Sequence, residues 1–248
     1  RHLKDRCKSL ESLNVFYADS EYTDECGVTA RKENTVIAPW KHLTEFSSLR
    51  ELEINSDEKS MKGMTETLGS LKNPRKLRLN FCDNLEPFTL GEKGNSWGQE
   101  ESIFDGLVQV KEFDFVIRPD QSEGISAPLY WTRYFINNLH KLKNLEVLRI
   151  FDSKETKIEM ADFLRLLRAL GQLATLTEII LHSKIIINDE ALELAAALYE
   201  DTSGTVGERL ISLLKSKVNW MIDLNPNLKL IDIRSFVGAK LDFIFYRK

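Results

Sequence analysis

Histidine and cysteine are the residue types most able to act as metal ligands or nucleophiles at neutral pH. The sequence contains His2, His42, His140, His182, Cys7, Cys26 and Cys82. No pair among them has the short spacing of a zinc site, and no cysteine lies in a local nucleophile signature. We therefore predict no metal, no cofactor and no enzymatic activity. The odd number of widely spaced cysteines is also not the pattern of a secreted disulfide framework.

A glycine-rich stretch at 91–98 is a second candidate, because glycine-rich loops can cradle phosphate groups. Gly91, Gly94 and Gly98 do not follow the order G-x-x-x-x-G-K-[ST], and the stretch does not lead from a strand directly into a helix. We interpret it as a surface loop. Whether this loop or a strand face carries a binding site is left open by the sequence.

Side chains suited to protein recognition accompany a recurring apolar pattern, L-x-x-L-x-L. The pattern is clear at Leu145, Leu148 and Ile150, and its second position recurs at residues 13, 52, 77, 113, 148, 179 and 231. Because side chains alternate along a strand, the residues beside these positions should face solvent. The candidate partner-binding residues are Phe16, Asn55, Arg78, Asn80, Val116, Arg149, Phe151, Ile180, His182 and Arg234.

The predicted binding face is centred on Arg149, Phe151, Ile180 and His182. Arginine and aromatic side chains are frequent interface anchors, and Phe16, Val116 and Phe151 are apolar where a merely solvated face would be polar. Two alternatives stay open. Loops of the same chain can cover these side chains, or the strands can be apolar on both faces, as parallel strands often are.

The elements that would position these residues alternate between strand and helix. Helices are expected over 40–47, 61–71, 129–142, 160–173, 188–200 and 206–218, and a closing strand or cap over 243–246. The helix at 160–173 has the clearest apolar stripe, with Phe163, Leu166, Leu167 and Leu170 on one face. Each interval between strands is long enough for a parallel crossover. The two longest, 13–52 and 179–231, have room for a degenerate further unit.

This repeated pattern resembles the leucine-rich repeat family over nearly the whole chain. The resemblance implies an α/β solenoid: a curved horseshoe with a parallel sheet on the concave side and helices on the convex side. Residues 1–248 would form a single such domain. Cys82 occupies the family's Asn/Cys ladder position. The other units hold Ala18, Asp57, Arg118, Ser153, Lys184 and Phe236 there, so an irregular solenoid is expected.

Irregular repeats with helical convex segments are similar to two intracellular groups. These are the substrate-binding part of F-box ubiquitin-ligase receptors and the sensing region of nucleotide-binding immune receptors. The resemblance implies a protein-binding module with its partner on the concave face. An adaptor would bind through a region that precedes Arg1. A structural subunit of a multiprotein complex is the alternative.

Composition and charge narrow the partner class further. Of the 248 residues, 42% are hydrophobic and 29% charged, as in packed globular domains, and the net charge is -4. This balance favours neither a nucleic acid nor an anionic membrane as partner. The sequence has no apolar run of about 18 residues, begins at Arg1 and shows no signal peptide. We therefore expect a cytoplasmic or nuclear fragment of a longer chain.

Overall fold

A computed structural model of the chain describes residues 10–16, 22–23, 29–30, 43–44, 46–56, 68, 70–81, 104, 107–117, 135–152, 157–186, 206–237 and 239–247. Most strands belong to one sheet: β1 (Ser12–Phe16), β4 (Glu51–Ser56), β5 (Lys76–Phe81), β6 (Glu112–Ile117), β7 (Val147–Asp152), β8 (Lys157–Glu159), β9 (Glu178–Ile186), β10 (Leu230–Val237) and β11 (Ala239–Tyr246). A separate antiparallel pair is formed by β2 (Tyr22–Thr23) and β3 (Thr29–Ala30). The helices are η4 (Leu139–Lys141), α4 (Met160–Gly171) and α6 (Val206–Leu224).

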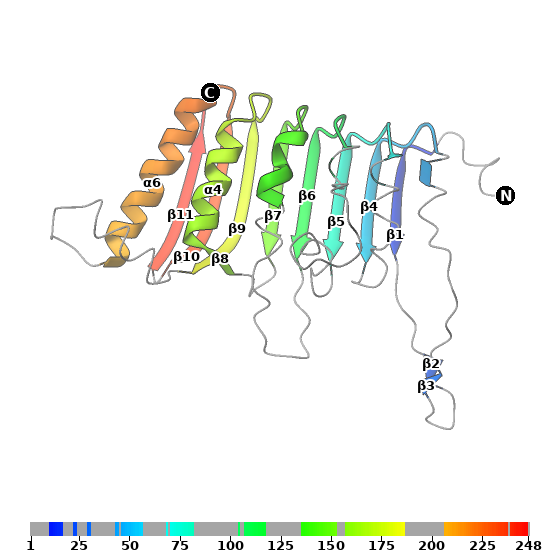
Figure 1. Cartoon of the computed structure of the whole chain (residues 1–248), viewed down its shortest axis with the longest axis horizontal. Helices are drawn as coiled ribbons and strands as arrows, with labels where there is room; N and C mark the ends of the chain where they lie inside the picture. The colour runs from blue at the N-terminus through cyan, green and yellow to red at the C-terminus, as the bar shows by residue number, and fades with distance from the viewer. Residues whose placement is uncertain are drawn as a thin grey trace.

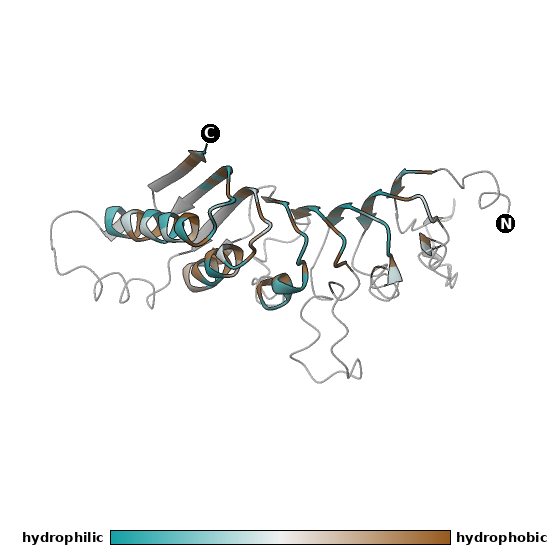
Figure 2. Ribbon diagram, turned by 90° about the horizontal axis from the view of Figure 1, so that it is seen from above, coloured by the Kyte–Doolittle hydropathy of each residue, from teal (hydrophilic) through white to brown (hydrophobic). Residues whose placement is uncertain are grey.

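The main sheet follows the chain from one end of the molecule to the other, in the order β1-β4-β5-β6-β7-β9-β10-β11, with β8 beside β9 (Figure 1). All neighbouring pairs are parallel except β10 and β11. Helices α4 and α6 lie on one side of the sheet (Figure 2). We call the opposite side the open face, because no described helix or strand covers it. The chain is thus an α/β protein with an open, mostly parallel sheet.

The apolar positions of the repeated pattern form the core on the helix side. Every described one from the second to the last unit is at most 2% exposed, as for Leu52, Leu77, Leu148 and Ile231. Four phenylalanine rings, Phe104, Phe113, Phe115 and Phe135, pack at centroid distances of 5.7 to 6.1 Å beneath the middle strands. The prediction that the pattern positions are buried is confirmed for these units, whereas Leu10, Leu13 and Val15 of the first unit are only half-buried. Truncating one such leucine to alanine costs about 2–5 kcal/mol.

The same turn precedes successive strands and is linked from one unit to the next. In the turns before β4, β6, β7, β9 and β10 the amide of the last apolar residue donates to a carbonyl three residues earlier, as in Leu145 to Leu142 at 3.1 Å. Pro74, at the same place before β5, has no amide hydrogen to donate. A side chain then reaches the previous turn. Asn73 donates to the carbonyl of Ser47 at 2.7 Å, and Asn144 to that of Val108 at 2.7 Å. Gln109, Thr175 and Asn227 make the equivalent bonds in their own units. These side-chain bonds connect the turns that precede the strands. The Asn/Cys position of the leucine-rich repeat family, which Cys82 occupies in the sequence, comes after a strand instead.

Helices α4 and α6 pack together over the C-terminal strands. Gly171 lets them approach closely, since a Cβ there would lie 3.3 Å from Leu224 Cδ1 and 3.4 Å from Met221 Cγ. Buried Asn225 follows α6 and donates to the carbonyls of Leu173 and Leu176 at 2.7 and 3.2 Å. These two bonds fix the end of α6 against the turn after α4.

Several sequence predictions need correction. Helix α6 continues past 218 to Leu224, because Met221 and Ile222 extend its buried side. The closing strand β11 begins at Ala239 rather than 243, and it runs antiparallel. β1 pairs directly with β4 and β9 directly with β10, so no further strand lies between these neighbours in the sheet, and the described residues of the two long intervals add no strand to it. The helix predicted over 188–200 and most of that over 61–71 lie outside the described residues.

Candidate functional site: the open face of the sheet

The strand register arranges the open-face positions of the strands in rows that run across the sheet. The first row is Ser12, Glu51, Lys76, Glu112, Val147, Glu178, Leu230 and Tyr246. The second row is Asn14, Glu53, Arg78, Asp114, Arg149, Ile180, Asp232 and Ile244. The third row is Phe16, Asn55, Asn80, Val116, Phe151, His182, Arg234 and Asp242. All predicted partner-binding residues therefore lie in two adjacent rows of one face.

Side-chain amides fill the third row at the N-terminal end. Asn55 Nδ2 donates to Asn14 Oδ1 at 2.9 Å, and Asn80 Nδ2 donates to Asn55 Oδ1 at 2.7 Å and Glu53 Oε1 at 2.8 Å. Asn55 and Asn80 are only 8% and 4% exposed. Their prediction as solvent-facing contact residues is wrong. Short amides on strands about 4.8 Å apart bond to each other and thereby cover each other.

A charge network occupies the middle of the second row. Asp114 is fully buried between two arginines, with Oδ2 2.9 Å from Arg78 Nη2 and Oδ1 3.1 Å from Arg149 Nη1. Arg149 also lies 2.9 Å from Glu178 and 3.4 Å from Glu112. Each carboxylate comes from a strand next to that of Arg149. The network therefore clamps β6, β7 and β9 together.

The charge state of Arg149 follows from these partners. Burial alone lowers the pKa of its guanidinium, but the negative charges of Glu178 and Asp114 and their hydrogen bonds outweigh that effect. The net result is a pKa above the ordinary arginine value. Arg149 is thus held as a permanent cation by the sheet itself. In this structure it pairs with Glu178 and with buried Asp114, a role that the sequence did not show.

Phe151 and His182 meet edge to face further along the third row. Their ring centroids lie 5.5 Å apart at an interplanar angle of 80°. His182 Nε2 is 3.7 Å from Asp232 Oδ2, which is beyond hydrogen-bond distance. Arg234 holds Asp232 from the other side with two bonds of 2.9 Å. Phe151 and His182, two of the predicted partner-binding residues, therefore contact each other and are half-buried on the open face.

Apolar side chains gather where the open face reaches β11. Ile180 and Leu230 are half-buried, and Ile244 and Tyr246 are 50% and 72% exposed. We call Ile180, Leu230, Ile244 and Tyr246 the apolar patch. Only Ile180 was among the predicted residues. The alternation of side chains along β11 could have identified Ile244 and Tyr246. Phe243 and Phe245 pack towards the core, so Ile244 and Tyr246 lie on the opposite side of the strand.

Other candidate chemistry is not assembled in the described part of the chain. No group of three or more His, Cys, Asp or Glu residues there is arranged to hold a metal ion. A hollow of about 420 Å³ beside η4 is lined by His140, Lys143, Gln172 and Thr175 among others. The Thr175 hydroxyl donates to the carbonyl of Leu145 at 2.7 Å, so it is not paired with a base. The three cysteines, His2, His42, loop 91–98 and the side chain of Phe16 lie outside the described residues.

Comparison with known proteins adds no relative. The sequence matches no protein-family model and no curated protein. None of the described helices is both long enough and apolar enough to span a bilayer. The case for function consequently depends on the geometry of the open face.

Proposed function

We propose that this chain is a leucine-rich repeat solenoid that recognises a protein partner through the open face of its sheet. Support comes from the unit that recurs along the chain: a turn, a cross-link to the previous turn, and a strand with buried apolar positions. In such a solenoid the open face is the concave one. Recognition would depend on shape and chemical complementarity to a preformed sheet, with no catalytic step.

The observation that carries this proposal is the apolar patch together with Phe151. Ile244 and Tyr246 expose 50% and 72% of their surface on a face that no described element covers. Large exposed apolar side chains that lie together mark interaction sites more often than isolated ones do. Val116, Phe151 and Ile180 extend the apolar surface towards the middle strands.

The concrete form of the proposal is the substrate- or partner-binding repeat domain of an intracellular assembly, such as a ubiquitin-ligase receptor. The sensing region of a nucleotide-binding immune receptor is the second version. A structural subunit of a stable complex is the third. Any domain found before Arg1 in the gene product would separate these versions. An F-box with a bound adaptor supports the first version, and a nucleotide-binding domain supports the second. The absence of both domains supports the third version.

The binding face itself is tested by quantitative affinity purification from the native source. The variant Ile244→Ser/Tyr246→Ser is compared with Val108→Ser/Trp220→Ser, which changes two exposed apolar residues away from the open face. We expect the first variant to lose at least one protein that the native chain and the control both retain. Equal retention by both variants, with unchanged circular dichroism, overturns the assignment of this face.

A further inference from the structure

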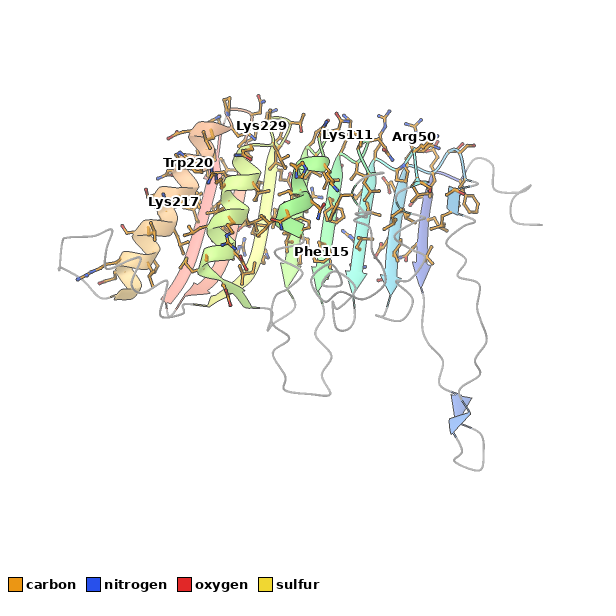
Figure 3. All side chains as sticks on the ribbon, in the orientation of Figure 1. Arg50, Lys111, Phe115, Lys217, Trp220 and Lys229 are labelled. Atoms are coloured by element: carbon orange, nitrogen blue, oxygen red, sulfur yellow. The ribbon has the colours of Figure 1, made fainter. Side chains whose placement is uncertain are left out.

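The residues that start the strands form a straight row along one edge of the sheet. The row is Glu11, Arg50, Arg75, Lys111, Glu146, Thr177, Lys229 and Arg247. Each backbone amide after the first donates to the carbonyl of the preceding member of the row, with N···O distances of 2.7 to 2.8 Å. We call this the start row. Figure 3 shows Arg50, Lys111 and Lys229 along this edge.

Positive charge is concentrated on the start row, although the whole chain has a net charge of -4. Arg50, Arg75, Lys229 and Arg247 are exposed. Lys111 forms an ion pair with Glu146 in the middle of the row. Within the described chain, no carboxylate forms an ion pair with Arg50, Arg75 or Lys229. Neighbouring turns add exposed Lys72 and Lys143 on the same edge.

The ion pair divides the row into two cationic groups. Arg50 and Arg75 start β4 and β5, and Lys229 and Arg247 lie where β10 begins and β11 ends. Lys111, Glu146 and Thr177 separate the groups. With strands about 4.8 Å apart, Arg75 and Lys229 are separated by four strand steps, or about 19 Å. Because the backbone ladder is continuous, this spacing is built into the fold.

The spacing of the cations fits an acidic polypeptide better than other polyanions. A nucleic acid carries a phosphate at every nucleotide, so a strand along the row would place phosphate against the carboxylate of Glu146. The exposed large apolar residues near this edge are separated along it: Val108 lies in a turn in the middle, and Leu224 and Tyr246 lie at the C-terminal end, so a membrane would gain little insertion along most of the row. A polypeptide can place carboxylates opposite the two groups and neutral residues opposite Glu146.

We propose that the start row binds an acidic segment of a protein partner, with two runs of acidic residues about 19 Å apart. This surface is separate from the open face and does not depend on the proposed function. The cations would supply long-range steering and salt-sensitive affinity. Glu146 and Thr177 would select against uniformly charged polyanions.

The test uses fluorescence anisotropy with a labelled peptide that has two runs of about four glutamates joined by about six Gly and Ser residues, enough to span the gap when extended. Arg75→Gln/Lys229→Gln removes one exposed cation from each group. Lys215→Gln/Lys217→Gln removes two exposed cations from α6, where Figure 3 places Lys217, away from this edge. Both double variants change the net charge equally.

We expect the start-row variant to raise the Kd about tenfold and the α6 variant less than about twofold, as the loss of two exposed charge contacts predicts. Native affinity should also fall as salt rises from low to physiological concentration. Equal weakening by the two variants overturns the proposal. Tighter binding of a single-stranded oligonucleotide of equal charge, or of phosphatidylserine vesicles, also overturns it in favour of those partners.

Discussion

The two ends of the open face differ in how their side chains are satisfied. Towards the N-terminus, Asn55, Asn80 and Asp114 are covered by hydrogen bonds and ion pairs from the neighbouring strands. Towards the C-terminus, Ile244 and Tyr246 stand on the same face without burial. Both ends have the alternation that predicts outward-facing residues. A side chain at an outward-facing position of a sheet can therefore be covered by its neighbours and be unavailable to a partner.

The difference follows from the residue types that the register aligns. Carboxylates beside arginines, and amides beside amides, reach across a spacing of about 4.8 Å and bond to each other, although Asn80 Oδ1 is buried without a partner among the described residues. The aliphatic side chain of isoleucine and the ring of tyrosine cannot be covered by such hydrogen bonds. They leave apolar surface exposed until a partner covers it, so one end of the face stabilises the sheet and the other end is available for recognition.

The largest expected effect is on the charge network. Asp114→Ala removes the buried carboxylate and leaves Arg78 and Arg149 facing each other, so the free energy of unfolding should fall by about 3 kcal/mol. Asp232→Ala, in the C-terminal half, removes a carboxylate whose partner Arg234 is exposed, and about 1 kcal/mol or less should be lost. Urea denaturation measures both values. A larger loss for Asp232→Ala would reverse the comparison.

A smaller loss is expected in the amide row. Asn80→Ala removes the bonds to Glu53 and Asn55 and leaves a buried amide oxygen on Asn55 unpaired, which should cost about 1–2 kcal/mol. Arg234→Ala is the control, since its exposed bonds to Asp232 should contribute about 0.5 kcal/mol. Thermal unfolding resolves the two. Indistinguishable values would show that the amide row does not stabilise the sheet.

The apolar patch should barely affect the fold. Ile244→Ser/Tyr246→Ser replaces exposed side chains, so we expect the unfolding free energy to change by about 0.5 kcal/mol or less per site. Fluorescence of a hydrophobic dye should fall, because less apolar surface is available. Substantial destabilisation, with unchanged dye binding, would assign these residues to the core.

The smallest expected effect is that of alkaline pH on the stability that Arg149 contributes. The pKa of Arg149 is raised in the folded protein, so the stability from its charge is fully present below the unfolded arginine pKa and is lost only above the folded value. The difference in unfolding free energy between the native chain and Arg149→Gln should therefore stay constant from about pH 7 to about pH 10. A difference that shrinks across this range would mean that another group supplies the charge.

Sequence reasoning located the strands and the outward rows because the apolar pattern and side-chain alternation are local properties. It placed Arg149 and Phe151 on one face, and the register confirms this. The roles of these residues were less accessible. Glu178 lies 29 positions after Arg149, and its carboxylate meets Arg149 only after the intervening chain has folded into α4 and its turns. The partners therefore depend on register, which the pattern alone did not define.

The end of α6 shows another limit of the local pattern. The predicted helix ended at 218, just before Asn219 and Trp220, which are exposed in the structure. Met221 and Ile222 resume the buried side where α6 meets α4. The direction of β11 was missed for a related reason. The short connection between Val237 and Ala239 makes a hairpin, and a hairpin must be antiparallel.

That hairpin has a consequence for how the sheet assembles. Every parallel pair joins strands whose crossover must first be closed, so its formation costs loop entropy that grows with chain separation. The pair β10 and β11 closes through the contact of Val237 with Ala239 and continues residue by residue to Leu230 and Tyr246. Hairpins form in about 1–10 μs, far faster than long-range pairings. The hairpin is therefore the pairing in this sheet that costs the least loop entropy to form.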